Sequence, residues 1–181
     1  MTGVQTCALP ISQTIDDFRY FFQPDKEISI FTLSSIFDES LKFLKEGLAR
    51  HYIDIEIEEY SDCEILGHKN ELVQVLLNLI SNSKDAIVST HKQNGKISLS
   101  VQRDKDIKIK LQDNGGGIDE EIIDKVFEPY FTTKFKEEGT GIGMYMSKMI
   151  VEQSMRGTLY LENIDDGVLV TITLPLGDKN A

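Results

Sequence analysis

Glu71-Leu-Val-Gln-Val-Leu-Leu-Asn-Leu-Ile-Ser-Asn-Ser-Lys-Asp-Ala86 is the stretch that decides the fold. Its apolar residues recur at helical spacing and predict an amphipathic helix: Leu72, Val75, Leu76, Leu79, Ile80 and Ile87. At about 100° per residue, a second face carries Glu71, Asn78, Asn82 and Asp85. Asparagine is a poor helix-interior residue because its amide competes for backbone hydrogen bonds. This polar face is therefore either simply solvated, or a row of oxygen atoms facing a hydrated cation and its phosphates.

The composition is that of one globular domain with a short attachment. The chain has 181 residues, of which 40% are hydrophobic and 27% charged. Its net charge of -11 argues against nucleic acid and against an anionic membrane as partners. ATP is not excluded, because backbone N–H groups alone can form a phosphate cradle. Cys7 and Cys63 form no metal or disulfide pattern, which fits a reducing, cytoplasmic compartment, and no apolar run is long enough to span a bilayer.

Hydrophobic periodicity predicts alternating helices and strands around the central helix, with a linker over 24–30. The other predicted helices span residues 33–49, 120–126 and 143–153. The predicted strands span residues 53–58, 97–101, 107–111, 158–163 and 168–174. Short polar links predict that the second and third strands form one hairpin, and that Asp165-Asp-Gly167 closes another.

Two glycine-rich segments are candidate ligand sites. Gly139-Thr-Gly-Ile-Gly143 precedes a helix, whose N-terminal N–H groups suit phosphate, although a flexible hinge is an equal alternative. It is neither a P-loop nor a dinucleotide fingerprint, because the residues those motifs require are missing. Asp113-Asn-Gly-Gly-Gly-Ile118 lets a ligand approach the backbone. Asp113 either accepts a hydrogen bond from an amine such as that of adenine, or is an Asx-turn residue.

A third segment, Phe127-Glu-Pro-Tyr-Phe-Thr-Thr-Lys134, carries aromatic residues that belong either to a lid or to the core. In chain order, the Asn-bearing helix, the first glycine segment, this segment and the second glycine segment closely resemble the four boxes of the catalytic ATP-binding domain of sensor histidine kinases. The resemblance covers about Phe31 to Pro175 and is strongest to the nitrogen-regulation type. It implies an α/β two-layer sandwich, with a mixed, mostly antiparallel sheet and helices on one face, as in gyrase, a heat-shock chaperone and mismatch-repair ATPases.

The resemblance also implies roles for individual residues. On the central helix, Asn78 would be the catalytic Mg²⁺ ligand and Asn82 would contact phosphate. Asp85 would line the ribose-phosphate edge, where many members instead carry Lys or Arg; here Lys84 stands one position earlier. The lid implied by the resemblance would span 131–138, and Lys134 within it either reaches a phosphate or is solvated.

Under the same resemblance, the first glycine segment would bind the adenine base and the second would bind the phosphates. Asp113 would bind the adenine amine, Gly115 and Gly117 would allow close approach, and Ile118 would pack on the base. The residues implied to wrap the phosphates are Gly139, Thr140, Gly141, Ile142, Gly143 and Met144. One departure is Arg156-Gly157, where the family has a Gly-Gly pair.

The expected phosphoacceptor histidine is missing. His51, His68 and His91 lack its sequence context, and residues 13–30 resemble the end of the dimerisation hairpin helix and a linker. Residues 1–12 resemble a translated sequencing adapter, with a disordered tail as the alternative, and 31–177 form the catalytic domain. We therefore expect this chain to bind Mg·ATP without phosphorylating itself.

The expected activity of the intact protein is transfer of the ATP γ-phosphoryl group to a histidine of its own dimerisation domain, within a homodimer. The phosphoryl group would then pass to the receiver domain of a response regulator. Two alternatives remain open: an ATPase or protein serine kinase of the same superfamily, and a non-catalytic nucleotide-binding module.

Overall fold

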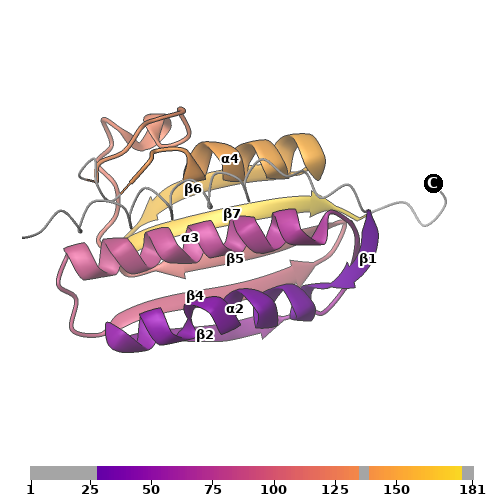
Figure 1. Ribbon diagram of the computed structural model, residues 1–181, viewed down its shortest axis with the longest axis horizontal. Coiled ribbons are helices and arrows are strands. Elements are labelled where there is room, and N and C mark those ends of the chain that lie inside the picture. The colour runs from indigo at the N-terminus through magenta and orange to yellow at the C-terminus, as the bar shows by residue number, and fades with distance from the viewer. Residues whose placement is uncertain (1–27, 135–138, 177–181) are drawn as a thin grey trace, which may run out of the picture.

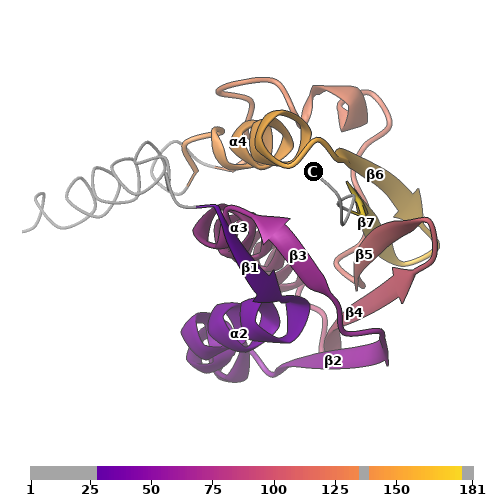
Figure 2. The same cartoon turned by 90° about the vertical axis from the view of Figure 1, so that its right-hand side faces the viewer.

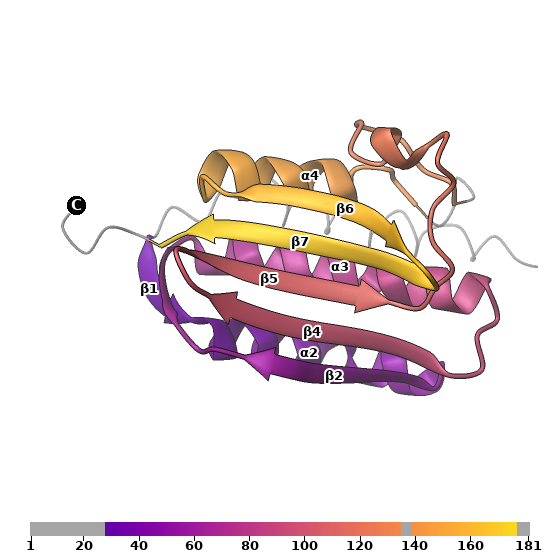
Figure 3. The same cartoon turned by 180° about the vertical axis from the view of Figure 1, so that it is seen from behind.

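A computed structural model describes residues 28–134 and 139–176 of the chain. Its main sheet has five strands in the order β2-β4-β5-β7-β6. β2 and β4 are parallel, and the other neighbouring pairs are antiparallel. The helices cover one face of the sheet, and the other face is open (Figures 1 and 3). This arrangement confirms the predicted two-layer sandwich. The strands are β2 (Ile53–Tyr60), β4 (Gly95–Arg103), β5 (Asp106–Asp113), β6 (Thr158–Ile164) and β7 (Gly167–Pro175).

Three helices form the second layer, which is seen end-on in Figure 2. They are α2 (Leu33–Arg50), α3 (Lys69–Ser89) and α4 (Gly143–Met149), and a π-helical turn, η2 (Ile150–Ser154), continues α4. α3 contains the central stretch, and its predicted apolar stripe is buried: Leu72, Val75, Leu76, Leu79, Ile80 and Ile87. The helical spacing of the sequence therefore predicts correctly which face of α3 meets the sheet.

The strands follow the period of two that their sequences predict. In β4, Ile97, Leu99 and Val101 are buried beneath the helices. β2 is different because it is an edge strand: Ile53 is buried, but Ile57 is 44% exposed. The pairing of β2 with β4 also shifts register between Ile57 and Glu59, as a β-bulge does.

A second, two-stranded sheet was not predicted. β1 (Ser29–Thr32) pairs antiparallel with β3 (Glu64–Gly67), whereas the sequence predicted a linker over 24–30 and no strand at residues 64–67. In this ribbon, Phe31 and its partner Ile65 are buried, whereas the neighbouring pair of Ile30 and Leu66 is exposed. Strands of four residues are too short for their alternation to stand out from the surrounding sequence.

The helix predicted over residues 120–126 is also wrong. The segment instead forms a single 3₁₀ turn, η1 (Ile123–Lys125). A short isolated helix is marginal unless packing supports it. None of the residues in this turn is fully buried, and Ile123 packs only partly against the core, so that support is weak here.

Some expectations fall on residues that the structure does not describe. They concern residues 1–12, the helix expected near residues 13–22, and residues 135–138 of the expected lid. Within residues 28–134 and 139–176, no helix is both long and apolar enough to cross a membrane.

The burial of α3 predicts how much its core residues stabilise the domain. Leu76 has no exposed surface, so Leu76→Ala should lower the free energy of unfolding by about 2–5 kcal/mol. Leu66→Ala is the matched control, because Leu66 is 62% exposed, and it should change stability by less than about 0.5 kcal/mol. Urea denaturation followed by circular dichroism measures both values. Equal effects of the two substitutions would contradict the assignment of the core.

Candidate functional site

α4 lies alongside α3, and the loop after β5 passes the C-terminal end of α3 (Figure 1). Midway along α3, Asn78 links the two helices: its Nδ2 donates to Ser147 Oγ at 3.0 Å and makes a longer contact of 3.8 Å to Met144 Sδ. Its Oδ1 faces Gly143, because a Cβ on that glycine would lie 2.2 Å from this oxygen. The side chain is thus held by its nitrogen, which leaves its oxygen as a potential ligand atom.

One turn further along α3, two more predicted residues meet Lys134. Lys134 Nζ donates to Asn82 Oδ1 at 3.2 Å and to Asp85 Oδ2 at 2.6 Å. The other oxygen of Asp85 pairs with Lys84 Nζ at 3.2 Å. Lys84 and Lys134 therefore share the Asp85 carboxylate, so positive charge exceeds negative charge around these three side chains.

Asp113 ends β5 and is almost fully buried, with 5% of its surface exposed. Ser83 Oγ donates to its Oδ2 at 2.7 Å, and the Gly115 N–H donates to its Oδ1 at 2.9 Å. Burial raises the pKa of Asp113, and these hydrogen bonds oppose that effect in part. The arrangement presents a fixed acceptor of hydrogen bonds in an apolar setting.

The loop after Asp113 needs its glycines. A Cβ on Gly115 would lie 2.7 Å from the Ala86 Cβ on α3, so the loop approaches the helix more closely than a larger residue allows. Gly117 adopts a positive φ of 78°. Asn163 then fixes the next residue, because it accepts from the Ile118 N–H at 2.8 Å and donates to the Ile118 carbonyl at 2.7 Å.

The second glycine segment is equally constrained. Gly141 has a φ of 67°, and a Cβ there would lie 2.5 Å from the carbonyl carbon of Tyr130. Thr140 is exposed, while the neighbours Gly139, Ile142 and Met144 are half-buried. Further along, Arg156 adopts a positive φ of 54°, a conformation in which glycine has no steric cost. This explains in physical terms why a glycine pair suits residues 156–157.

The structure thus brings the predicted residues together in three groups. Asn78 lies against Gly143 and Met144. Asn82 and Asp85 both bond Lys134. Asp113 bonds Gly115 in the loop that leads to Ile118. Phe127 packs on the core and lies under Lys148, whose Nζ is 4.8 Å from the ring centroid, whereas Tyr130 is 75% exposed.

The sequence did not predict the roles of Ser83, Ser147 and Asn163. Ser83 bonds Asp113, Ser147 bonds Asn78, and Asn163 bonds Ile118. A signal for the two serines was present. Ser83 lies between Ile80 and Ile87 at helical spacing, and Ser147 likewise precedes Ile150 on a buried face. Most buried serine hydroxyls have a hydrogen-bond partner, so each position indicated a buried hydrogen bond.

A resident metal would find few protein ligands here. Over the described part of the chain, no cluster of three or more His, Cys, Asp or Glu residues is arranged to hold a metal ion. Amide oxygens remain, and Mg²⁺ is commonly bound by one or two protein oxygens together with substrate phosphates and water. Asn78 Oδ1 fits this limited role.

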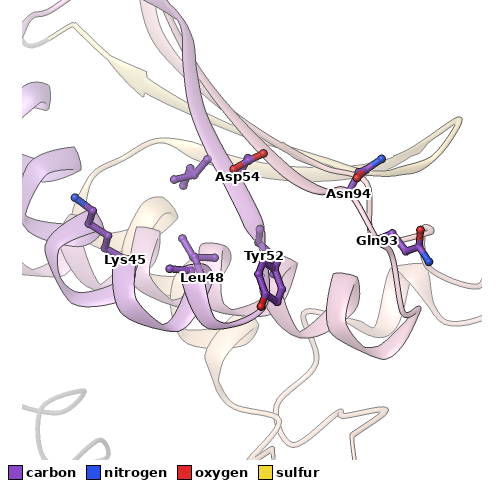
Figure 4. Close-up of a pocket in the computed structure, with 9 residues that line it drawn as sticks. Lys45, Leu48, Tyr52, Asp54, Gln93 and Asn94 are labelled. Atoms are coloured by element: carbon purple, nitrogen blue, oxygen red, sulfur yellow. The ribbon is translucent and has the colours of Figure 1, made fainter.

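A separate cleft of about 520 Å³ opens between the end of α2 and the start of β2 (Figure 4). Its wall includes Lys45, Tyr52 and Asp54. None of the residues predicted to bind nucleotide lines this cleft.

Comparison with known proteins finds one family. Residues 67–178 match the family described as histidine kinase-, DNA gyrase B- and HSP90-like ATPase. The chain is similar to sporulation kinase D of Bacillus subtilis, with 30% identity over 171 residues, covering 92% of this chain and 32% of that protein. It is also similar to the two-component sensor PprA of Pseudomonas aeruginosa, with 33% identity over 148 residues, covering 77% of this chain and 16% of that protein. The chain thus spans only a minor part of these relatives.

Solved structures show the same fold. The catalytic domain of histidine kinase ThkA superposes with a TM-score of 0.73 and 28% identity, covering 82% of this chain and 95% of that chain. ThkA in complex with the response regulator protein TrrA gives a TM-score of 0.70 and 25% identity, covering 91% of this chain and 48% of that chain.

The raised pKa of Asp113 predicts a pH-dependent cost of folding. The stability that this group contributes is fully present below its unfolded pKa of about 3.9, and is lost as the pH rises through its higher folded pKa. Asp113→Asn removes the titration, so the variant should gain stability relative to the wild type between about pH 4 and pH 7, by about 1.4 kcal/mol for each unit of pKa shift. Urea denaturation at several pH values measures the difference. Asp104→Asn, in an exposed turn, is the control, and a difference for Asp113→Asn that is constant with pH would contradict the prediction.

Proposed function

The chain belongs to the histidine kinase-, DNA gyrase B- and HSP90-like ATPase family, as a catalytic domain of the sensor histidine kinase type, and we propose that residues 31–177 bind Mg·ATP and donate its γ-phosphoryl group to a histidine. The observation that carries the proposal is the buried carboxylate of Asp113 beneath a glycine loop, beside the asparagine-bearing face of α3. In this proposal ATP is the substrate, and adenine recognition and phosphate binding are separate tasks.

Asp113 suits the adenine amine. An ionised carboxylate only accepts hydrogen bonds, and the exocyclic amine of adenine only donates them. Gly115 and Gly117 let the base approach the backbone, and the half-buried Ile118 offers an apolar surface for its face. Recognition of the base therefore needs only one charged group.

The phosphate end combines the second glycine segment with α3. Residues 139–144 contribute backbone around the phosphates, and Asn82 and Lys134 contribute polar side chains. Lys134 now contacts Asp85, and a triphosphate carries more negative charge than this single carboxylate. We infer that Lys134 exchanges Asp85 for phosphate when ATP binds, and that Asp85 then lines the edge of the site.

Asn78 is the proposed Mg²⁺ ligand and the proposed catalytic residue. Its Nδ2 is held by Ser147, so its Oδ1 can be directed to a cation without further ordering. When bound, Mg²⁺ would neutralise charge on the phosphates. The protein contributes position: it holds the γ-phosphorus toward an external nucleophile while the bond to the β-phosphate oxygen breaks and ADP leaves.

The phosphoryl acceptor comes from another domain in this proposal. His51 and His91 lie at the ends of α2 and α3, and His68 precedes α3, so all three belong to the scaffold of the domain. We propose that the acceptor is a histidine of a dimerisation domain within a homodimer in the cytoplasm, and that a response-regulator receiver domain takes the phosphoryl group next. The resemblance to a histidine kinase solved with a response regulator supports the last step.

Phosphotransfer to a separately produced dimerisation hairpin tests the function. Incubation of the domain and hairpin with radiolabelled ATP should place an acid-labile label on the hairpin and none on the domain alone. Acid-stable label would instead indicate a serine kinase, and free phosphate without label an ATPase. Asp113→Asn should weaken ATP binding by about 1–3 kcal/mol, because the asparagine amide replaces one of the two accepting oxygens with an NH₂ donor. ATP binding without transfer or hydrolysis would support a nucleotide-binding module and overturn the kinase proposal.

Asn78→Asp tests the metal assignment. The added charge at the ligand position should shift the Mg²⁺ concentration needed for ATP binding by roughly tenfold, and should affect metal-free nucleotide affinity less. Isothermal titration calorimetry across a series of Mg²⁺ concentrations measures both. Asn70→Asp, exposed in the first turn of α3, is the matched control. Identical Mg²⁺ dependence in the two variants would remove Asn78 from the metal site.

A further inference from the structure

We propose that Ser83 is a positioning residue for the nucleobase, and that its hydroxyl fixes the Asp113 carboxylate as an acceptor for the exocyclic amine of adenine. The inference rests on the proposed nucleotide site and deepens it. It assigns base selectivity to a contact between α3 and β5, in addition to the carboxylate itself.

The geometry of the contact is that of a strong, buried hydrogen bond. Ser83 is 4% exposed and Asp113 is 5% exposed. Their oxygens lie 2.7 Å apart, within the range for a hydroxyl that donates to a carboxylate. The Gly115 N–H holds the other carboxylate oxygen at 2.9 Å. Because α3 holds one oxygen and the loop after β5 holds the other, the carboxylate cannot rotate freely.

The contact also decides what the carboxylate can recognise. An ionised carboxylate has about four lone-pair positions, and Ser83 and Gly115 occupy one on each oxygen. A donor such as the amine of adenine suits a remaining position. The carbonyl oxygen that guanine carries at the same place is an acceptor, and an acceptor that faces a carboxylate without a proton is repelled.

Neutral donors alone oppose protonation of Asp113. The charged side chains on the elements around it pair elsewhere: Lys84 with Asp85 on α3, Lys96 with Glu56 and Glu58 beside β4, and Lys92 with Asp166 in the turn before β7. Loss of the Ser83 hydroxyl would therefore remove one of these donors, and among residues 28–134 and 139–176 no cation contacts the carboxyl to replace it. A protonated Asp113 carries an O–H donor, so it no longer rejects guanine.

The fold itself gives little reason for a serine at this position. Alanine is smaller by one oxygen and favours helices more than serine does. Ser83→Ala should therefore leave the fold intact. Ser40 on α2 offers a matched comparison, because it is equally buried at 0% exposure and its Oγ has no hydrogen-bond partner among the described residues.

The test compares wild type, Ser83→Ala and Ser40→Ala by calorimetric titration with Mg·ATP and Mg·GTP, at about pH 5 and about pH 8. Ser83→Ala should bind ATP about tenfold more weakly, with a larger loss at the lower pH, and its preference for ATP over GTP should narrow. Carbon-13 NMR of the nucleotide-free protein should show the Asp113 carboxyl titrating at higher pH in Ser83→Ala. Ser40→Ala should match the wild type throughout.

The outcomes separate this inference from the proposed function. A wild type that binds no ATP overturns the proposed function and the nucleobase role with it. A wild type that binds ATP, with Ser83→Ala indistinguishable from it, overturns only the inference. Equal loss of ATP and GTP affinity at both pH values, with an unchanged Asp113 titration, also overturns it, because such a loss reflects a structural role.

Discussion

The packing of α3 on the sheet is the interaction on which the rest of the domain depends. Leu76 and Ile80 are fully buried on one side of this helix, while Asn78 and Asn82 lie on another. Because helical rotation per residue is fixed, seating the apolar stripe also sets the direction of every polar side chain. A shift of α3 in the core would move the candidate phosphate contacts and the support of Asp113 together, so core packing and ligand geometry cannot vary independently.

Much of this fold follows from pattern alone. Apolar residues that recur every 3.6 residues predict α3, and those that recur every 2 residues predict the strands of the two hairpins. The order of the four boxes indicates the family. The β1–β3 ribbon was missed because its strands are short, and the 120–126 helix was predicted wrongly because its apolar residues Ile123 and Val126 are only partly buried against the core. Local propensity carries little information where tertiary contacts decide the outcome.

The sequence singles out the members of the candidate site but not the contacts between them. Asn78, Asp113 and the glycines stand out in the sequence because their residue types are unusual for their positions. Their partners Ser83, Ser147 and Asn163 are distant in sequence and chemically ordinary, so only the folded structure brings them together. The pairing of Lys134 with Asp85 is also visible only in space, and it explains how an acidic residue fits where many relatives carry a basic one.

The register shift in β2 bears on how the domain behaves at high concentration. A free strand edge is a template on which another chain can add a strand, and natural sheets prevent this with bulges and charges. β2 combines both devices, because the shift between Ile57 and Glu59 interrupts its regular edge, and Asp54, Glu56 and Glu58 give it negative charge. The edge therefore resists sheet-to-sheet aggregation even where many copies of the domain are crowded together.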